Sequence, residues 1–544
     1  MNFAPARAWS AFLVLLMGAL WPLAFAPFQQ SWLAFVVLGL LFFLVQRSSS
    51  PRRAAGLGFL FGFAAFCSGV YWLAITLHNF AHMDWALAAA AVALLAAYCA
   101  LYPALAMGLA RRFAPAARWW LLPVFWVFAE YLRARIATGF PWLAVGYTQT
   151  GGFLAGYAPW LGQYGVGLAT AGVASLGAWA LSRRREAAVW SMAISGILLI
   201  FAIALFAATQ RFTQPVGAPL QVRLLQGNVP ISEKWNANRI NAILDRYVRL
   251  IIASPPGTQL IVLPETAFPI FQTQIPLLIH QLQEWSAKKH AVLMIGIPED
   301  AGQGRYYNAT MEIDGMAPLR WYRKQHLVPF GEYIPFPHLL GPLVHHFLPG
   351  LGSFTPGTGS SVLPVDGQLA GMSICYEESF SRDVRKGVVE GATFLVNSSD
   401  YAWYGHSSAS AQTLQMAIMQ SLQEQKPDIR ATNTGITSVI LPTGQVLAAL
   451  PQFSYGALNA SIQPMAGKTP FARLGNWPYL GLSLLLFLIG FLRSRRSRGG
   501  AGSGLPMDVG GDDAEGANDD EQHGYDLLPP QTLLEDVMTK KEDE

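Results

Sequence analysis

Long apolar runs are the feature that most constrains what this chain can fold into. Eight of them approach the roughly 20 residues that an α-helix needs to cross a bilayer. Because 52% of the residues are hydrophobic and only 13% are charged, a wholly soluble fold is excluded. The sequence therefore predicts a polytopic α-helical membrane domain of about eight transmembrane helices. The runs lie at residues 9–27, 32–46, 55–77, 85–110, 119–135, 160–182, 188–208 and 477–492.

The positions of the arginines predict how these helices are oriented. Short loops rich in Lys and Arg stay on the cytoplasmic side of a membrane. Arginine clusters follow the second, fourth, sixth and eighth runs, at 47–53, 111–118, 183–185 and 493–498. With the N-terminus inside, all four clusters fall in the cytoplasm. The C-terminus is then also cytoplasmic, and the polar region 209–476 lies on the outer side.

Arg133 and Arg135 are an exception, because they lie at the outer end of the fifth run. Two interpretations are open: their side chains snorkel to the interface, or together with Glu130 they bind an anionic head group. The next stretch, residues 139–153, is too rich in Gly and aromatic residues for a simple spanning helix. Irregular backbone at membrane depth usually lines a cavity inside the protein, which makes this stretch a candidate lipid-access site.

Between residues 220 and 463, short β-rich runs alternate with helical ones. The pattern predicts strands at 221–229, 259–268, 291–299 and 393–399, a hairpin at 306–326, and helices at 231–254, 275–289, 379–390 and 410–424. Such alternation indicates a buried sheet covered by helices. The predicted division is 1–208 for helices 1–7, 209–476 for an outer domain, 477–493 for helix 8 and 494–544 for the C-terminal tail.

Two further segments have unusual composition. Residues 329–358 are rich in Pro, Gly, Leu and Phe, and a loop this long is a lid, a binding loop or disorder. Its apolar residues are expected to touch lipid. Residues 499–544 hold thirteen Asp or Glu against two Lys, so a basic flank is followed by an acidic tail that is expected to be disordered. This tail is either native or an added sequence.

Three residues of the outer domain carry candidate chemistry. Cys375 follows an apolar strand-like run. Cys67 and Cys99 lie instead inside long apolar segments, where a cysteine can serve simply as a small hydrophobic residue. A cysteine nucleophile needs a base, and a cation or N–H groups that stabilise negative charge. Glu265 ends one predicted strand and Lys324 ends another, so the pair can supply both functions without a metal.

The motifs around these residues resemble those of a known family. A glutamate, a lysine and a cysteine in this order are typical of the nitrilase, or carbon–nitrogen hydrolase, superfamily, whose fold is an αββα sandwich. Within it the chain is similar to the apolipoprotein N-acyltransferase family over nearly its whole length except the acidic tail. The matching segments are FAPF, TGFPWLAVGY, LPETAFP, YRKQHLVPFGEYIP, SICYEESF, RATNTGITSVILPTGQV and GNWPYL.

The resemblance implies roles for single residues. Glu265 matches the catalytic base, Lys324 the oxyanion-stabilising lysine and Cys375 the nucleophile. Supporting or substrate-binding positions of the family fall on Trp235, Glu332, Tyr376 and Glu377. Each of these four also has an ordinary interpretation, as a packing aromatic, a loop carboxylate or a residue in the first turn of a helix.

The resemblance also implies a reaction. The enzyme would move a fatty acyl chain from a phospholipid, the sn-1 chain of phosphatidylethanolamine, to the α-amino group of the diacylglyceryl-cysteine of an apolipoprotein. It would do so through a cysteine thioester in a ping-pong scheme. No cofactor, metal or nucleic acid is expected, and the chain is expected to be a monomer. The location implied is a bacterial inner membrane, with the catalytic domain in the periplasm.

The sequence departs from the family in one region, and alternatives to the family's reaction stay open. The segment 397–405, NSSDYAWYG, is one residue longer than in the family, and Gln420 and Gln423 stand where Arg and Glu are common. The main alternative is a membrane-anchored nitrilase-type amidase acting on a small amide. A transporter, or a scaffold with an inactive domain, is a third possibility, which the scarcity of intramembrane charges disfavours.

Overall fold

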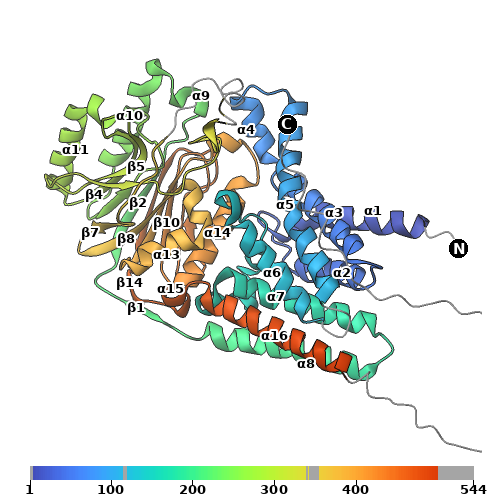
Figure 1. Cartoon of the computed structure of the whole chain (residues 1–544). Helices are drawn as coiled ribbons and strands as arrows, with labels where there is room; N and C mark the ends of the chain where they lie inside the picture. Colours follow the sequence, from blue (N-terminus) through green and yellow to red (C-terminus); the bar gives the residue numbers. More distant parts are fainter. Residues whose placement is uncertain (1–3, 114–118, 339–340, 342–353, 500–544) are drawn as a thin grey trace, which may run out of the picture. The chain divides into compact units, whose positions relative to one another are not determined.

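The computed structural model describes residues 4–113, 119–338, 341 and 354–499. Residues 1–493 form one compact unit, and the rest belongs to a second. The predictions for the loop at 339–340 and 342–353, and for the acidic tail from residue 500, lie outside the described residues. The chain is drawn in Figure 1, with its elements labelled in sequence order.

All eight predicted apolar runs are helical. They form α1 (Ala4–Leu20), continued by the 3-10 turn η1 (Trp21–Ala24), α2 (Trp32–Gln46), α3 (Pro51–Gly69) with α4 (Trp72–Phe80), α5 (Trp85–Phe113), α6 (Leu121–Arg133), α7 (Ala158–Ser182), α8 (Ala187–Ala208) and α16 (Trp477–Gly499). In the described residues three segments are long and apolar enough to cross a membrane: Trp85–Phe113, Phe153–Ser182 and Ala187–Ala208. The pair α3 and α4, bent by 54°, would be a fourth. The number of eight spans stays a prediction.

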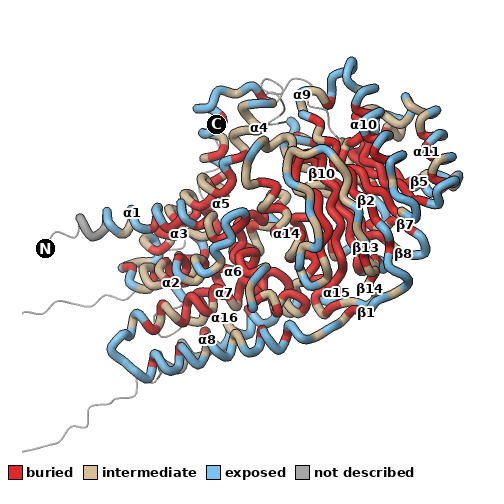
Figure 2. Tube along the Cα trace, turned by 180° about the vertical axis from the view of Figure 1, so that it is seen from behind, coloured by how far each residue is buried: buried red, intermediate tan, exposed pale blue. Residues whose placement is uncertain are grey.

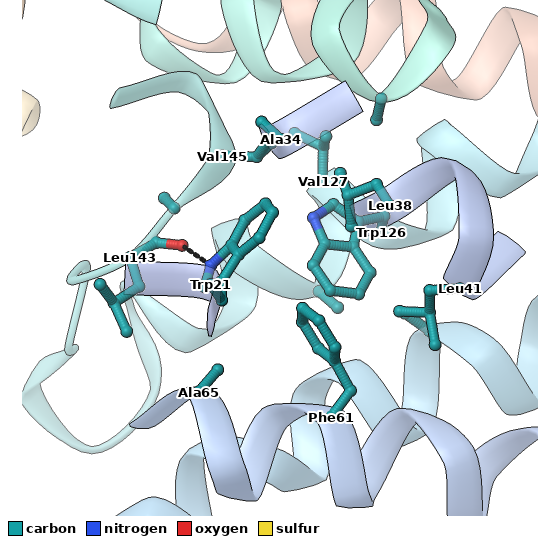
Figure 3. Close-up of a cluster of buried hydrophobic side chains, with 14 of the residues drawn as sticks. Trp21, Ala34, Leu38, Leu41, Phe61, Ala65, Trp126, Val127, Leu143 and Val145 are labelled. Carbon is teal, nitrogen blue, oxygen red and sulfur yellow. Dashed lines mark hydrogen bonds between the residues drawn. The ribbon is translucent and has the colours of Figure 1, made fainter. Parts of the chain in front are cut away.

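The irregular stretch after α6 is enclosed by protein. It forms the 3-10 turns η3 (Ile136–Thr138), η4 (Val145–Gln149) and η5 (Phe153–Tyr157). Figure 3 shows how it is held: Trp21 packs edge-on against Phe61 and donates its indole N–H to the Leu143 carbonyl at 3.4 Å. Trp126 also contacts Phe61, with ring centroids 5.8 Å apart. The stretch is therefore bonded to η1, which packs against α3.

Arg133 and Glu130 serve this same anchoring. Arg133 is only 2% exposed, donates to the Trp142 carbonyl at 2.7 Å and lies over the Phe66 ring. Glu130 accepts from the Val145 backbone N–H at 3.0 Å. The prediction that Arg133 snorkels or binds a head group is therefore wrong, because its charge is buried against protein carbonyl and ring. Arg135 is exposed and lies over Tyr131.

Two six-stranded sheets form the centre of the region between α8 and α16. The first has the order β13-β2-β3-β4-β5-β6 and the second β12-β11-β10-β9-β8-β7. In each, three central strands are parallel, β2, β3 and β4 in one and β8, β9 and β10 in the other, while the outer strands pair antiparallel. The bounds are β2 (Leu220–Gln226), β3 (Leu260–Val262), β4 (Val292–Asp300), β5 (Tyr306–Ile313), β6 (Arg320–Arg323), β7 (Val362–Val365), β8 (Gln368–Ile374), β9 (Phe394–Ser399), β10 (Asp428–Thr432), β11 (Ser438–Ile440), β12 (Val446–Ala449) and β13 (Gly456–Ile462); β1 (Thr213–Pro215) pairs with β14 (Met465–Gly467).

The sheets pack face to face, and helices cover their outer faces. The core between them joins residues such as Leu224 and Val262 of the first sheet to Met372 and Val396 of the second. Figure 2 shows central strands such as β2 and β10 buried along most of their length. The outer face of the first sheet carries α10 (Ile240–Ile252) and α11 (Pro276–Lys289). The second carries α13 (Ser381–Val389) and α14 (Ala409–Glu424), with the short α15 (Pro470–Leu474) beside them. The predicted αββα sandwich is confirmed.

One predicted helix is wrong in detail. The stretch 231–254 is not one helix but α9 (Ile231–Lys234), a break at Trp235 and Asn236, the 3-10 turn η6 (Ala237–Arg239) and then α10. The Asn236 side chain accepts from the Asn238 backbone N–H at 3.0 Å. This local bond is the way in which Asn competes with helix formation, and it starts a new helical turn here.

Helices of the N-terminal half contact the sandwich directly. Gln415 of α14 accepts from the Ala26 backbone N–H at 3.0 Å. Gln412 of the same helix bonds the Trp72 indole N–H at 3.1 Å and the Gly69 carbonyl at 3.0 Å. Residues 66–72 and α14 are therefore joined by buried hydrogen bonds at the bend between α3 and α4.

Candidate active site

The three predicted catalytic residues each follow the end of a strand. Cys375 comes directly after β8, Lys324 directly after β6, and Glu265 lies in the turn after β3. Strands β3 and β6 belong to one sheet and β8 to the other. The contacts described below bring all three side chains to one end of the sandwich.

Lys324 lies between two carboxylates. Its side chain is 1% exposed, and Nζ is 2.9 Å from Glu332 Oε2 and 3.5 Å from Glu265 Oε1. Burial alone would lower the lysine pKa, but the charges of Glu332 and Glu265 outweigh it, so that the pKa is raised well above its ordinary value. Lys324 is therefore a fixed ammonium group at physiological pH.

Asn308 of β5 ties the two carboxylates together. Its side-chain amide donates to Glu265 Oε1 and to Glu332 Oε1, each at 2.7 Å. The second oxygen of Glu265 accepts from the Asp400 backbone N–H at 3.1 Å. The second oxygen of Glu332 accepts from the Val328 backbone N–H at 2.8 Å. Both carboxylates are thus fixed in position around the ammonium group.

Cys375 has an unusual backbone. Its φ is +52°, in the left-handed region that side chains other than Gly rarely adopt. Such strain persists where the surrounding structure imposes it, and it is concentrated at functional sites. The turn η8 (Cys375–Ser379) begins at this residue, so the thiol stands at a sharp corner between β8 and the following helical turn.

The thiol is neutral at rest. Burial, the negative charges of Glu265 and Glu332 and a hydrogen bond to Glu265 raise its pKa well above the ordinary value, and the Lys324 charge opposes them only in part. Reactive thiolates are usually found where the pKa is lowered. Here the proton must leave as the sulfur attacks, and the hydrogen-bonded Glu265 carboxylate is placed to accept it.

Glu377 positions the other residues and does not bond the thiol. It accepts from the Ile374 backbone N–H at 2.8 Å, from the Gln325 and His326 backbone N–H groups at 2.7 and 2.9 Å and from the Tyr322 hydroxyl at 2.7 Å. Burial raises its pKa, although these bonds oppose the shift. Its four bonds join the strand end that carries Cys375 to the one that carries Lys324.

Tyr376 connects the nucleophile to the N-terminal half. Its hydroxyl donates to the Gly139 carbonyl at 2.5 Å, and its ring stacks on Trp142 with centroids 5.8 Å apart. Gly139 has φ +96°, and a Cβ there would lie 2.3 Å from the Ala134 carbonyl oxygen. The anchored stretch after α6 therefore forms one wall beside Cys375.

Trp235 is the one predicted site residue that is not in this cluster. Its side chain is 54% exposed, and within the described part of the chain no hydrogen bond or ring contact joins it to the other six. Its neighbour Lys234 is 3% exposed instead. Lys234 forms a buried ion pair with Asp400 and donates to the Glu265 carbonyl at 2.9 Å.

The sequence reasoning missed Asn308, Lys234 and Asp400. Asp400 follows directly after β9, and its carboxylate also accepts from Asn433 Nδ2 at 3.1 Å. A polar residue at the end of a buried strand was the signal used for Glu265, and the same signal applies to Asp400. Lys234 and Asn308 gave no comparable signal, because one lies in a predicted helix and the other inside a predicted strand.

The departures from the family have defined contacts. Gln423 accepts from the Gln163 backbone N–H at 2.7 Å, next to Gly162, whose φ of +66° interrupts α7. Gln420 donates to the Glu378 carbonyl at 2.9 Å. Both amides therefore join α14 to its neighbours. In the described ranges no three His, Cys, Asp or Glu side chains are grouped in a way that could hold a metal ion.

Both halves of the chain are similar to known proteins. Residues 17–176 match the apolipoprotein N-acyltransferase N-terminal domain, and residues 221–471 match the carbon-nitrogen hydrolase family. The apolipoprotein N-acyltransferase of Ralstonia nicotianae is 39% identical over 89% of this chain and 94% of its own length. That of Methylococcus capsulatus is 38% identical over 89% of this chain and 96% of its own. A nitrilase-superfamily amidase of Nesterenkonia AN1 aligns with a TM-score of 0.35 and 16% identity, over 48% of this chain and 95% of that one.

The αββα sandwich and its match to the carbon-nitrogen hydrolase family define the class of the domain that spans residues 221–471. The additional match of the helical half, and the full-length relatives, narrow this class further. The chain belongs to the apolipoprotein N-acyltransferase family.

Proposed function

We propose that this chain is a membrane acyltransferase that N-acylates lipoproteins. The acyl donor is a phospholipid, the sn-1 chain of phosphatidylethanolamine, and the acceptor is the α-amino group of an apolipoprotein's diacylglyceryl-cysteine. The observation that carries the proposal is the cluster of Cys375, Glu265 and Lys324 at one end of a carbon-nitrogen hydrolase sandwich. Relatives named apolipoprotein N-acyltransferase support the choice of substrates.

In the first half-reaction Cys375 is the nucleophile. Its sulfur attacks the ester carbonyl while the thiol proton passes to the Glu265 carboxylate. The Lys324 ammonium group stabilises the oxyanion that forms. The ester C–O bond then breaks, Glu265 returns the proton to the leaving alkoxide, and a lysophospholipid departs from a thioester acyl-enzyme.

In the second half-reaction the amine of the acceptor attacks the thioester carbonyl. Glu265 takes the proton from the amine, the C–S bond breaks and the amide forms. The sulfur leaves as a thiolate and takes this proton from Glu265, which regenerates the resting enzyme. Because the lysophospholipid leaves before the amine reacts, the scheme is ping-pong. Glu332 fixes Lys324 throughout, Glu377 holds the two strand ends together, and Tyr376 holds the wall formed by the stretch after α6. We assign Trp235, on the exposed side, to substrate contact.

The proposed setting is the bacterial inner membrane. Eight helices span it, seven within residues 1–208 and one at 477–493, and the catalytic domain 209–476 lies on the periplasmic side with both termini in the cytoplasm. The arginine clusters support this orientation. A site at head-group height would receive both lipid substrates and keep water from the thioester.

The test is trapping of the acyl-enzyme. Purified protein incubated with acyl-labelled phospholipid and no acceptor should carry label in a hydroxylamine-sensitive bond. The Cys375→Ala variant should carry none. The Cys67→Ala variant is the matched control, because Cys67 is a free thiol of α3, and it should label like the unaltered protein. Equal labelling of Cys375→Ala, or faster turnover of a small soluble amide than of phospholipid, would overturn the proposal.

A further inference from the structure

A cavity of about 470 Å³ lies away from the residues of the reaction. Its walls come from the turn after η1, from the bend between α3 and α4, from the segment leading into α14 and from the loop after β12. The rings of Phe28, Tyr71 and Phe453 line it, and His406 stacks on Phe453 with centroids 3.7 Å apart. Phe28 and Tyr71 are exposed, so the cavity has an aromatic rim.

Three polar groups of this cavity are available to a ligand. Among the described residues, no hydrogen bond is formed by the Tyr71 hydroxyl, the His406 ring or the Gln452 side-chain amide. The part of the lining that the structure describes contains no Lys, Arg, Asp or Glu. A phosphate-bearing head group is therefore a poor occupant, because it is bound through cations or converging N–H groups. An acyl chain is also a poor occupant, because it would bury these polar groups without partners.

The segment 400–406 connects this cavity to the catalytic cluster. At one end, the Asp400 backbone N–H bonds Glu265 Oε2 at 3.1 Å. At the other, His406 lines the cavity. The ring of Tyr404, in between, contacts Trp72 with centroids 4.8 Å apart. Since a chain spans at most about 3.6 Å per residue, His406 lies within roughly 22 Å of Asp400. An extended peptide of six to eight residues covers that distance.

We propose that this cavity binds the peptide chain of the lipoprotein acceptor, a few residues after its lipid-modified cysteine. The inference rests on the proposed function, which requires such an acceptor. Aromatic faces with available hydrogen-bonding groups suit a peptide backbone of any sequence, because backbone N–H and C=O groups are present in every acceptor. The site therefore selects for an extended chain and not for particular side chains.

The experiment compares two synthetic acceptors, diacylglyceryl-cysteine followed by one neutral residue and diacylglyceryl-cysteine followed by seven. The unaltered enzyme should have the lower KM for the longer acceptor. In the Tyr71→Phe/Gln452→Leu variant, two hydrogen-bonding groups are lost at nearly constant volume. The KM for the longer acceptor should then rise roughly 5- to 30-fold, while the KM for the shorter one changes less than about twofold. Ala411→Phe, which fills the cavity from α14, should act in the same direction.

The matched control is Tyr306→Phe/Gln274→Leu, which changes the same residue types away from the cavity and should leave both KM values unchanged. Equal KM values for the two acceptors in the unaltered enzyme would overturn the inference. So would cavity variants that raise both KM values together, because that pattern indicates a structural role. A failure of the proposed function would be recognised separately, because the unaltered enzyme would then carry no label from the phospholipid. That result would also overturn this inference.

Discussion

Two buried clusters of a cation with carboxylates lie in the same sandwich, and they are built differently. At the catalytic end, one ammonium group, Lys324, faces the two carboxylates of Glu265 and Glu332. On the other side of the turn that begins at Cys375, Arg430 forms an ion pair with Glu378, with Nε 2.9 and 3.0 Å from the two carboxylate oxygens. A second buried carboxyl group, Asp428, lies near this pair, and burial together with the charge of Glu378 raises its pKa well above the ordinary value, which favours its neutral form. The first cluster has an excess of negative charge beside a thiol, whereas the second is a matched pair.

This difference in charge balance suits the two clusters to different roles. The unbalanced cluster places the Glu265 carboxylate beside the thiol, which is where a general base must lie. The Arg430–Glu378 pair is shielded from solvent, because both residues are buried. Arg430 also donates to the Tyr401 hydroxyl at 3.0 Å. Neighbouring glutamates after Cys375 connect to the two clusters: Glu377 holds the strand end of Lys324, and Glu378 pairs with Arg430. We therefore expect removal of the Lys324 ammonium group to stop the reaction, and removal of the Arg430 guanidinium group to destabilise the fold.

The largest effect is expected from Lys324→Met. Loss of the ammonium group removes the oxyanion partner and leaves two carboxylates beside the thiol, so the rate of thioester formation should fall roughly 1,000-fold or more. Single-turnover labelling with acyl-labelled phospholipid measures it. Lys289→Met, at the exposed end of α11, is the control and should label normally. A Lys324→Met protein that labels at the normal rate would show that the unbalanced cluster has no part in the reaction.

A smaller effect, on stability, is expected from Arg430→Met. Glu378 would remain buried without its cation, and the free energy of unfolding should fall by about 3 kcal/mol. Denaturation of the purified protein in detergent measures this change. The double variant Arg430→Met/Glu378→Leu removes both charges and should recover most of the loss. If the double variant is as unstable as the single one, the loss of stability in Arg430→Met does not come from an unpaired, buried Glu378.

The smallest effect is expected from a carboxylate that has no such partner. Glu424 of α14 is buried, its carboxylate oxygens have no hydrogen-bond partner among the described residues, and burial raises its pKa from 4.5 to about 8, against the charges of Arg385 and Lys426. Between these two pH values the folded protein keeps the proton and the unfolded chain releases it. Stability must therefore fall as the pH rises through this window.

Glu424→Gln should remove that part of the pH dependence. The variant should gain a few degrees in Tm at pH 8 relative to the unaltered protein, with little difference near pH 4.5. Thermal unfolding at several pH values measures it, with the exposed Glu284→Gln as control. Burial lowers the pKa of Lys426 to about 8. This shift affects stability only above pH 8, where it makes stability rise with pH. A Tm gain that is the same at all pH values would contradict the assignment.

Much of this architecture could be predicted from the sequence, for identifiable reasons. Apolar runs become helices because their length and composition leave few alternatives, and Glu265, Lys324 and Cys375 follow strands that were visible as β-rich runs. Contacts between distant segments could not be predicted. Nothing in the sequence around Arg133 shows that it meets the Trp142 carbonyl, and an amide such as Asn308 has no pattern that distinguishes a bridge between carboxylates from an ordinary strand residue. The break at Trp235 was missed because the competing bond of Asn236 is local and overrides helical periodicity.

The hydrogen bond from Tyr376 to the Gly139 carbonyl has a consequence for how this enzyme can be divided. The residue next to Cys375 is held by a loop from the helical half, and Tyr147 adds a bond to the Ser379 carbonyl at 3.4 Å. A fragment consisting of the sandwich alone would expose the Tyr376 ring to water and lose the wall beside the thiol. The hydrolase domain is therefore not a portable module on a membrane anchor: its working geometry is shared between both halves of the chain.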